Sequence, residues 1–239
     1  MANGLCRAEA RELLWLAPTP SQAARLSLAQ IRSALKRAGR QRGIDAEAQR
    51  LREILRSEYA HQPLLVEDAL GKQMLALLAQ LEATCTAADD LAKAVQEAFP
   101  KHPDAEVITS FPGLGVQLGA RILAEIGDDR DRFADARGLK AYAGSAPITR
   151  ASGKKHHVGR RMVKNDRLNH AGYLWAFSAI TASPGAKIHY GRRREKGDWH
   201  AQAQRHLFNR MIGQLHHCIH AGELFDEHLA FPSLLAAAA

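Results

Sequence analysis

The first sixty residues carry hydrophobic positions spaced three and four apart, which is the spacing of amphipathic helices. The pattern predicts a short helix over Ala8 to Leu16, a second over Ser21 to Gly39 and a third over Asp45 to Tyr59. Two prolines end the first helix, and Ser21 is the expected N-cap of the second. The hydrophobic faces of the second and third helices consist of Leu28, Ile31, Leu35, Leu51, Ile54 and Leu55.

A long helix is predicted between Pro63 and Pro100, where apolar positions follow steps of four and three over nearly four heptads. This seam indicates a coiled coil. The pattern leaves open whether the seam packs within the chain, against the preceding helices, or between two chains. The predicted organisation is residues 1–62 as N-terminal helices left from a longer protein, 63–100 as a coiled-coil helix and 101–239 as a compact C-terminal domain. The seam consists of Leu70, Met74, Leu77, Leu81, Thr84, Ala88, Leu91 and Val95.

Helical periodicity also dominates residues 101–239, so the predicted fold class is mainly α. Gly127 is expected to stop a helix that starts after Gly115, and two later helices are expected over 171–181 and 200–220. Residues 148–151 are predicted to form a short strand. A turn at Ser183-Pro184-Gly185 ends the helix before it, and the chain is expected to fray from Phe231 onward. The helix after Gly115 is expected to bury Val116, Ala120, Leu123 and Ile126, and the last helix Leu207, Met211, Leu215 and Ile219.

The turn Pro112-Gly113-Leu114-Gly115 opens the first of these helices and is similar to a helix-hairpin-helix element. In such an element, glycines let the backbone approach a phosphate, and free N–H groups at the helix N-terminus bind it. Gly113 and Gly115 are therefore candidate nucleic-acid contacts of a sequence-independent kind. A tight turn between two helices with no ligand explains the same residues.

Ser152 lies in a Ser-Gly turn with Arg150, Lys154 and Lys155 beside it in sequence. A serine hydroxyl becomes a nucleophile when a base or cations stabilise its alkoxide, and cations also stabilise the charge that develops on an attacked phosphate. These neighbours make Ser152 a candidate nucleophile. The alternative is that Ser152 is only a small polar turn residue.

Charge adds to this picture. The 239 residues carry a formal net charge of +8, and the pI is about 9.7. Residues 150–210 hold fourteen lysines and arginines against three acidic residues, a local net charge of +11. One sign over sixty residues favours contact with a polyanion such as nucleic acid. The candidate phosphate-binding residues are Lys154, Lys155, Arg160, Arg161, Lys164 and Arg167.

Metal, disulfide and membrane signals are weak. The three cysteines are far apart, in no metal-binding spacing, and suit a reducing cytoplasm. His216 and His220 share a helix face without a supporting ligand, and the acids near Asp128 read as solvated loop residues, so no metal site is assigned. No apolar run is long enough to cross a membrane, and no secretory signal is present.

The sequence from Phe111 to Lys155 resembles the C-terminal domain of the insertion-sequence one-ten family of transposases. These are RNA-guided DNA recombinases of bacterial mobile elements, and the similarity extends from about Leu26 to Pro232. The specific parts are the PGLG turn, the block AYAG-x-x-PITRASGK and the turn ASPGA at 182–186. The resemblance implies that Ser152 is the nucleophile that joins DNA covalently.

The family also has an N-terminal RuvC-like domain whose four acidic residues bind magnesium, and no such domain is found in this sequence. The resemblance therefore implies that Mg²⁺ and the acidic half come from elsewhere, with Arg150 the candidate for the reacting phosphate. It further implies DNA and a guide RNA as partners, a homo-oligomer or an assembly with full-length transposase, and a cytoplasmic, nucleoid-associated protein.

Two functions follow from these observations. One is a transposase or recombinase subunit that uses Ser152 on a DNA phosphodiester. The other is a non-catalytic module that binds DNA or RNA and oligomerises. A Ser152→Ala variant separates them, because only the first function requires the hydroxyl for DNA joining.

Overall fold

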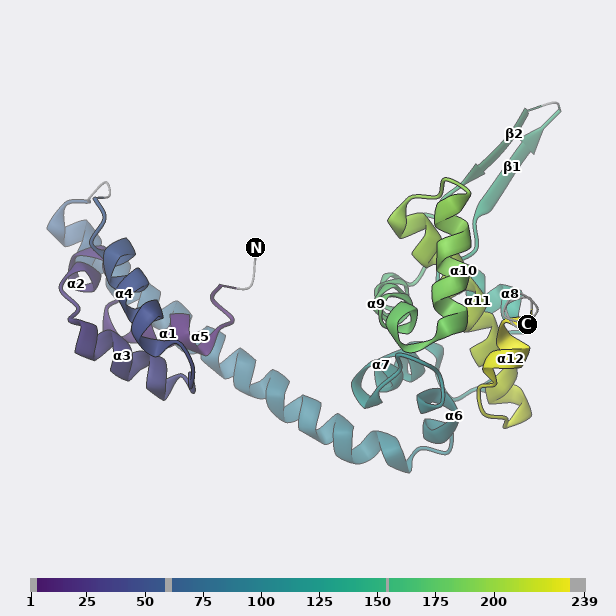
Figure 1. Cartoon of the computed structure of the whole chain (residues 1–239), viewed down its shortest axis with the longest axis horizontal. Coiled ribbons are helices and arrows are strands. Elements are labelled where there is room, and N and C mark those ends of the chain that lie inside the picture. The colour runs from purple at the N-terminus through teal and green to yellow at the C-terminus, as the bar shows by residue number, and fades with distance from the viewer. Residues whose placement is uncertain (1–3, 59–61, 154, 233–239) are drawn as a thin grey trace. The chain divides into compact units, whose positions relative to one another are not determined.

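A computed structural model describes residues 4–58, 62–153 and 155–232. The chain is mainly α-helical, as predicted, and its described part contains a single two-stranded sheet. It divides into two compact units, Met1–Leu91 and Ala92–Ala239, and the division falls within the long helix α5 (Figure 1). The three-part organisation inferred from the sequence stays a prediction.

Four short helices build the body of the first unit: α1 (Ala8–Leu16), α2 (Pro20–Ala24), α3 (Leu28–Arg37) and α4 (Ile44–Leu55). The helix predicted over residues 8–16 is confirmed with its bounds. Helix α3 packs against α1 and α4. The core between them is fully shielded from solvent at Ile31, Leu35 and Ala48, so the hydrophobic face predicted for residues 28–35 is the one that is buried.

The single helix predicted over Ser21 to Gly39 is wrong, because the chain breaks at Ser27. The Ser27 side chain accepts a hydrogen bond from the backbone N–H of Gln30, and the Gln30 side chain accepts one from the N–H of Ser27. This capping box starts a new helix at Leu28. The expected N-cap is also wrong: Thr19 caps α2, whereas the Ser21 N–H and hydroxyl donate to the Glu67 carboxylate at 2.8 and 2.9 Å.

Helix α5 (Leu64–Ala98) confirms the predicted long helix and ends, as expected, just before Pro100. It buries Glu67, Gly71 and Leu78, and the last two lie one position after the seam residues Leu70 and Leu77. At seam positions Leu70, Leu77 and Leu91 the side chains are 50, 54 and 68% exposed. A seam packed within the chain would bury these leucines, and the described residues leave them open. A seam between two chains stays a prediction.

The second unit is built around helices α9 (Asp166–Ala182) and α11 (His200–Ala221), which pack against each other. Helices α7 (Val116–Ile126) and α10 (Pro184–Glu195) pack on α9, and α8 (Ala136–Tyr142) packs on α11. Shorter elements complete the unit: η1 (Phe99–Lys101), α6 (Ala105–Thr109), η2 (Arg130–Arg132), β1 (Ile148–Ser152), β2 (Lys155–Gly159) and α12 (Glu227–Ala230).

Aromatic side chains fill the centre of this unit. The Trp175 ring meets Phe111 and Phe208 edge to face, with ring centroids 5.6 and 6.2 Å apart, and all three side chains are at most 2% exposed. Edge-to-face contacts suit the charge distribution of aromatic rings. The faces predicted for α7 and α11 both pack into this core, and Gly127 ends α7 as expected.

Three expectations for the second unit are corrected. Ser183 and Pro184 end one helix and also start another, α10, because the Ser183 hydroxyl caps it and Pro184 occupies its first turn. The helix predicted from residue 171 begins at Asp166, since the Asn165 side chain caps it there. Phe231 does not fray: it is 2% exposed, and the Arg210 guanidinium lies 5.2 Å from its ring centroid.

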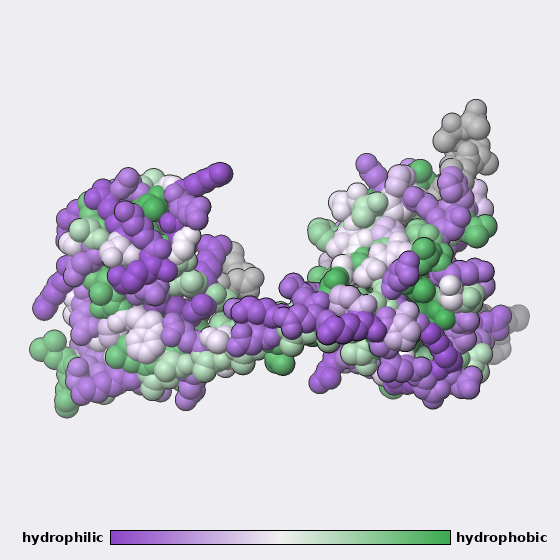
Figure 2. Space-filling model, turned by 90° about the horizontal axis from the view of Figure 1, so that it is seen from below, coloured by the Kyte–Doolittle hydropathy of each residue, from purple (hydrophilic) through white to green (hydrophobic). Residues whose placement is uncertain are grey.

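On the faces drawn in Figure 2, hydrophilic residues intersperse with small hydrophobic patches. Among the described helices, none combines the length and apolar character that a membrane span requires.

Candidate nucleic-acid interface

The strand predicted over residues 148–151 is confirmed, and it pairs with a second strand that the sequence did not predict. Strands β1 and β2 form an antiparallel hairpin in which Ile148 faces Gly159 and Ser152 faces Lys155. Gly153 has a φ of +55° in the connecting turn, a conformation that favours glycine. The hairpin projects from the body of the second unit (Figure 1). It therefore presents its tip to solvent.

Ser152 is exposed at the tip of this hairpin. Because side chains alternate across a strand, its register with β2 places Ser152, Lys155 and His157 on one face. Position 150 lies on that face too, but only its backbone is described, and Lys154 lies outside the described residues. Within the described part of the chain, no hydrogen bond to the Ser152 hydroxyl is found. Of the described side chains on this face, Lys155 and His157 are the ionisable groups that share it with Ser152.

Ser145, seven residues earlier in the same block, is a structural serine. It is 2% exposed, and its hydroxyl lies 3.2 Å from the Lys140 carbonyl oxygen and 3.0 Å from the Asn209 side-chain oxygen. A group buried and bonded in this way cannot reach a large substrate. Of these two serines, only Ser152 is available for chemistry.

The candidate cations of the hairpin and of the segment after it differ in solvent exposure and in their bonds to other residues. Lys155 and Arg160 are exposed, and the Arg167 side chain is 82% exposed, with its guanidinium 3.9 Å from Glu125. Lys164 is only 15% exposed and forms a 2.6 Å ion pair with Asp166. The Arg161 Nε donates to the Ala146 carbonyl at 3.4 Å. Lys155, Arg160 and Arg167 are thus the best placed for a mobile polyanion.

A polar network fixes the segment that carries these cations. The Asn165 side-chain amide donates to the Glu125 carboxylate and to the Tyr142 hydroxyl, each at 2.7 Å. The Asn165 backbone N–H donates to the Tyr142 carbonyl at 2.8 Å, and the Asn169 amide donates to the Ala143 carbonyl at 3.0 Å. These bonds tie the start of α9 to α7 and α8. The backbone at the end of the segment that carries the cations is therefore held in place.

The glycine turn lies away from the hairpin, at the other end of the second unit (Figure 1). Gly113 has a φ of +81°, and a Cβ there would come within 2.7 Å of the Ala179 backbone nitrogen. The Trp175 indole donates to the Pro112 carbonyl at 3.0 Å. This glycine therefore serves the close packing of the turn on α9.

Gly115 differs, since a Cβ there would meet nothing within 4 Å. It is the N-cap of α7, and no side chain caps the first N–H groups of that helix. This end of α7 keeps donors available. The helix-hairpin-helix role stays a prediction, with Gly115 as the open position and Gly113 as the packed one.

A cleft at the base of the hairpin was not anticipated from the sequence. Its wider part, about 640 Å³, lies between β2 and the start of α11, and its narrower part is about 210 Å³. The two parts share Arg160, Ala201 and Arg205, so we treat them as one space, the hairpin cleft. Its other polar or aromatic lining residues include Lys164, Asn169, Tyr173, Arg193, Trp199, Gln202, Gln204 and His206.

Positive charge dominates the hairpin cleft. No aspartate or glutamate occurs among its lining residues in the described chain. Arg193 is held by Asp198 at 2.5 Å and lies 2.8 Å from the His206 ring nitrogen. Burial, helped by the charges of Arg193 and Arg205, lowers the pKa of His206 below its usual value. The ring is thus neutral at pH 7, and the cleft's charge comes from its arginines and Lys164.

One residue of the cleft had a signal in the sequence. Gln204 lies three residues before Leu207, on the face of α11 that is otherwise apolar, and a polar residue at a core position is unusual. Trp199 had no such signal, because nothing in the pattern distinguishes an exposed tryptophan from a buried one.

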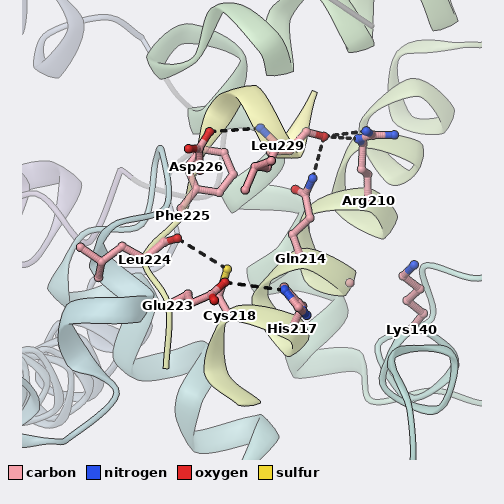
Figure 3. A pocket seen from close by; sticks show the side chains of 12 residues that line it. Lys140, Arg210, Gln214, His217, Cys218, Glu223, Leu224, Phe225, Asp226 and Leu229 are labelled. Carbon is pink, nitrogen blue, oxygen red and sulfur yellow. Dashed lines mark hydrogen bonds and ion pairs between the residues drawn. The ribbon is translucent and has the colours of Figure 1, made fainter. Parts of the chain in front are cut away.

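A second cavity, of about 460 Å³, lies between α11 and the C-terminal residues. Two of its polar side chains hold the C-terminal segment: Arg210 and Gln214 donate to the Ala230 carbonyl at 2.6 to 2.8 Å (Figure 3), while the Gln214 side-chain oxygen has no partner among the described residues. Burial raises the pKa of the Cys218 thiol, which disfavours the reactive thiolate. We assign this cavity a role in holding α12.

No group of three or more potential metal ligands occurs among the described residues. The acids near Asp128 have local partners: Asp129 caps η2, Asp135 caps α8 and Asp128 pairs with His102. The His220 ring nitrogens face the carbonyls of His216 and Arg130 at 2.8 and 2.9 Å. The residues that the structure describes therefore do not fit a magnesium site.

Comparison with known proteins gives the family context. Residues 105–191 match the family model described as "Transposase IS116/IS110/IS902 family". This segment contains the glycine turn, the hairpin, all of α9 and the first part of α10, whereas Trp199 and Gln204 lie beyond it.

Over 237 residues the chain is 66% identical to the "Mini-circle putative transposase for IS117" of Streptomyces coelicolor, covering 99% of this chain and 57% of that protein. It is 34% identical over 163 residues to the "Insertion element IS900 uncharacterized 42 kDa protein" of Mycobacterium paratuberculosis, covering 67% of this chain and 41% of that protein. A third relative is the "Insertion element IS110 uncharacterized 43.6 kDa protein" of Streptomyces coelicolor. It is 33% identical over 138 residues, covering 57% of this chain and 34% of that protein. The chain thus spans between about a third and three fifths of the length of these relatives.

Proposed function

Since this chain belongs to the IS116/IS110/IS902 family of transposases, we propose that it acts in DNA transposition, with Ser152 as the nucleophile that joins a DNA strand. The Ser152 oxygen attacks a phosphodiester phosphorus, forms a phosphoserine ester and releases a deoxyribose hydroxyl. One ester bond replaces another, so the step requires no external energy source. The hydroxyl proton leaves to a base, and the departing oxygen gains a proton.

The observation that carries this proposal is the exposed position of Ser152 on a cationic hairpin inside the segment that the family model matches. Nothing in the described chain occupies its hydroxyl, and Lys155 stands opposite it in the β-ladder. Cations beside an attacked phosphate stabilise the charge that develops on its oxygens. A projecting hairpin also suits a substrate as large as duplex DNA.

Roles for the neighbouring residues follow from their placement. Arg150 is the proposed contact to the reacting phosphate, and Lys154, Lys155, Arg160, Arg161, Lys164 and Arg167 neutralise the DNA backbone. Gly115 leaves helix N–H groups open for a second phosphate at the far end of the unit, while Gly113 lets the turn pack. Such contacts are sequence-independent, and binding should weaken steeply with salt.

The reaction also needs a metal site. Among the described residues, no base is hydrogen-bonded to the Ser152 hydroxyl and no group of three potential metal ligands occurs. We infer that a RuvC-like acidic half holds Mg²⁺ and assists the reaction. A guide RNA is the proposed source of sequence specificity, since the phosphate contacts carry none.

A second function is favoured by one specific observation, the exposed leucine seam of α5. A strip of apolar side chains on a long helix suits a coiled coil between copies or with a full-length relative. Under this alternative the chain binds DNA or RNA and oligomerises without joining strands. Both functions use the basic surface, and only the first needs Ser152.

Covalent trapping tests the proposal. The purified chain is mixed with labelled element-end DNA, Mg²⁺, candidate guide RNA and a separately supplied RuvC-like half, then denatured and resolved by electrophoresis. We expect a protein–DNA adduct that Ser152→Ala abolishes. Ser145→Ala, a change of the structural serine, is the matched control and should retain the adduct. A full-length relative run in parallel establishes that the conditions support joining.

If the relative forms an adduct and this chain forms none, the catalytic proposal fails and the binding function takes its place. An adduct that survives Ser152→Ala would place the nucleophile elsewhere in the chain.

A further inference from the structure

We propose that the hairpin cleft holds an unstacked nucleobase of a single nucleic-acid strand, with Trp199 as the stacking platform and Gln204 as the group that pairs with the base. This inference rests on the proposed function only in that the chain acts on nucleic acid. It adds a site separate from Ser152, whose stacking and pairing residues, Trp199 and Gln204, lie beyond the segment matched by the family model. The wider part of the cleft, which Trp199 lines, has a volume of about 640 Å³, within the usual range of small-ligand sites. The narrower part, which Gln204 lines, has a volume of about 210 Å³ and shares Arg160, Ala201 and Arg205 with it.

Trp199 is the first argument. It precedes α11 directly and is 80% exposed, whereas Trp175 in the core is fully buried. Tryptophan is rarely so open unless its ring meets a partner. The residue lines a cleft that contains arginines and no acids. An aromatic face beside cations is the combination with which proteins hold single strands, because every base offers a face for stacking.

Gln204 is the second and independent argument. Its side chain is 0% exposed, yet neither its amide nitrogen nor its amide oxygen has a hydrogen-bond partner in the described chain. It lines the narrower part of the cleft, together with Tyr173 and Phe208. Buried polar groups are nearly always paired, so a donor and an acceptor left open together point to a missing partner. A nucleobase edge presents adjacent donors and acceptors, and an amide side chain can pair with both.

The cations of the cleft complete the match. The Arg160 guanidinium donates to the Met162 sulfur at 3.6 Å, and within the described residues no ion pair of Arg160 or Arg205 is found. The two arginines border both parts of the cleft. They are therefore free to bind the phosphates on either side of an inserted base. Arg193 is already engaged by Asp198 and has a positioning role.

A single strand fits this arrangement better than a duplex. In a duplex the base faces are stacked and the pairing edges are occupied, so neither Trp199 nor Gln204 would find its partner. DNA and RNA share the chemistry that the cleft recognises, and the experiment below distinguishes them.

Tryptophan fluorescence tests the proposal with the full chain. Single-stranded DNA, single-stranded RNA and duplex DNA of equal length are titrated at one fixed salt concentration. We expect a single strand to quench the exposed Trp199 and to bind more tightly than the duplex. Whichever of DNA or RNA binds more tightly is identified as the source of the base. Trp199→Ala should remove the quenching and weaken single-strand binding about tenfold or more, in line with the loss of one stacked base.

Trp15→Ala is the matched control for this change. Trp15 is 40% exposed and lies in the first unit. Its substitution should leave both the quenching by single strands and their affinity as in the wild type. Because Trp199 is largely in solvent, its removal should also leave the melting temperature unchanged.

Gln204→Met separates recognition from structure. Methionine of similar size removes two unpaired polar atoms from a buried site, so the melting temperature should stay level or rise. Single-strand affinity should fall at the same time. A purely structural glutamine would show the opposite pair of results, a lower melting temperature and unchanged affinity.

The inference is overturned if Trp199→Ala binds single strands as tightly as the wild type, or if duplex DNA quenches Trp199 equally. If Gln204→Met fails to fold, the Trp199 variants still decide the outcome. Failure of the proposed function is distinct: there, the Ser152 adduct is missing while single-strand binding and quenching persist.

Discussion

The β1–β2 hairpin and the α9–α11 helix pair belong to one unit, but different interactions hold each of them together. On the hairpin, Ser152, Lys155 and His157 are exposed, and the strands are joined by backbone hydrogen bonds. In the helix pair, Trp175 and Met211 are completely shielded from solvent. Burial of large apolar side chains is the dominant stabilising term in a fold. The hairpin contributes little of it.

This difference separates function from stability. A residue on the hairpin can change without loss of core packing, whereas a change in the helix pair is felt throughout the unit. The proposed nucleophile lies on a hairpin whose described residues contribute nothing to the buried core cluster of the second unit. The glycine turn combines both kinds of position. Gly113 packs closely against α9, as core residues do, whereas Gly115 is open to substitution, as the hairpin residues are.

The largest effect is expected from Trp175→Ala. The change leaves a cavity among Phe111, Phe208 and α9 and removes the hydrogen bond to Pro112. We expect a loss of about 3–5 kcal/mol, measured by chemical denaturation of the wild type and variant. Trp15→Ala, in a 40% exposed position, should cost clearly less. Equal losses would contradict the view that stability resides in the α9–α11 core.

An intermediate effect is expected from Gly113→Ala. A Cβ would strike the Ala179 backbone, and the φ of +81° is strained for any other residue. Together these should cost about 2–4 kcal/mol in thermal or chemical unfolding. Gly115→Ala is the matched control, with open space around the position, and should cost at most about 1 kcal/mol. A reversed order would show that the turn does not pack on α9 as described.

The smallest effect is expected at Ser152. Ser152→Ala removes an exposed hydroxyl without a partner in the described chain and should stay within about 0.5 kcal/mol of the wild type. The same substitution at Ser145 leaves the Asn209 side chain and the Lys140 carbonyl without that hydroxyl and should cost about 1–3 kcal/mol. Differential scanning calorimetry of both variants checks the contrast. A Ser152→Ala protein that melts far below the wild type would assign that residue a structural role.

Local sequence signals determined much of the secondary structure. The helix over residues 8–16, the long helix of residues 64–98, the stop at Gly127 and the buried face of α11 all follow from apolar spacing and from proline or glycine. These signals depend on neighbours within a few turns, and so they are readable in order along the chain. The fold class and the family resemblance were readable for the same reason.

Other features were decided by tertiary contacts. Strand β2 has four polar or small residues out of five and forms because β1 pairs with it. The N-terminal end of α10 is completed by Glu227, which accepts hydrogen bonds from the Ser183 hydroxyl and the Gly185 N–H from far along the chain. The hairpin cleft joins Arg160 after β2 with Trp199, Gln204 and Arg205 at the start of α11. The sequence contains these residues and their charge. Only the folded chain brings them together, because packing between distant segments, and not local preference, determines which side chains stay open and which polar atoms lack a partner.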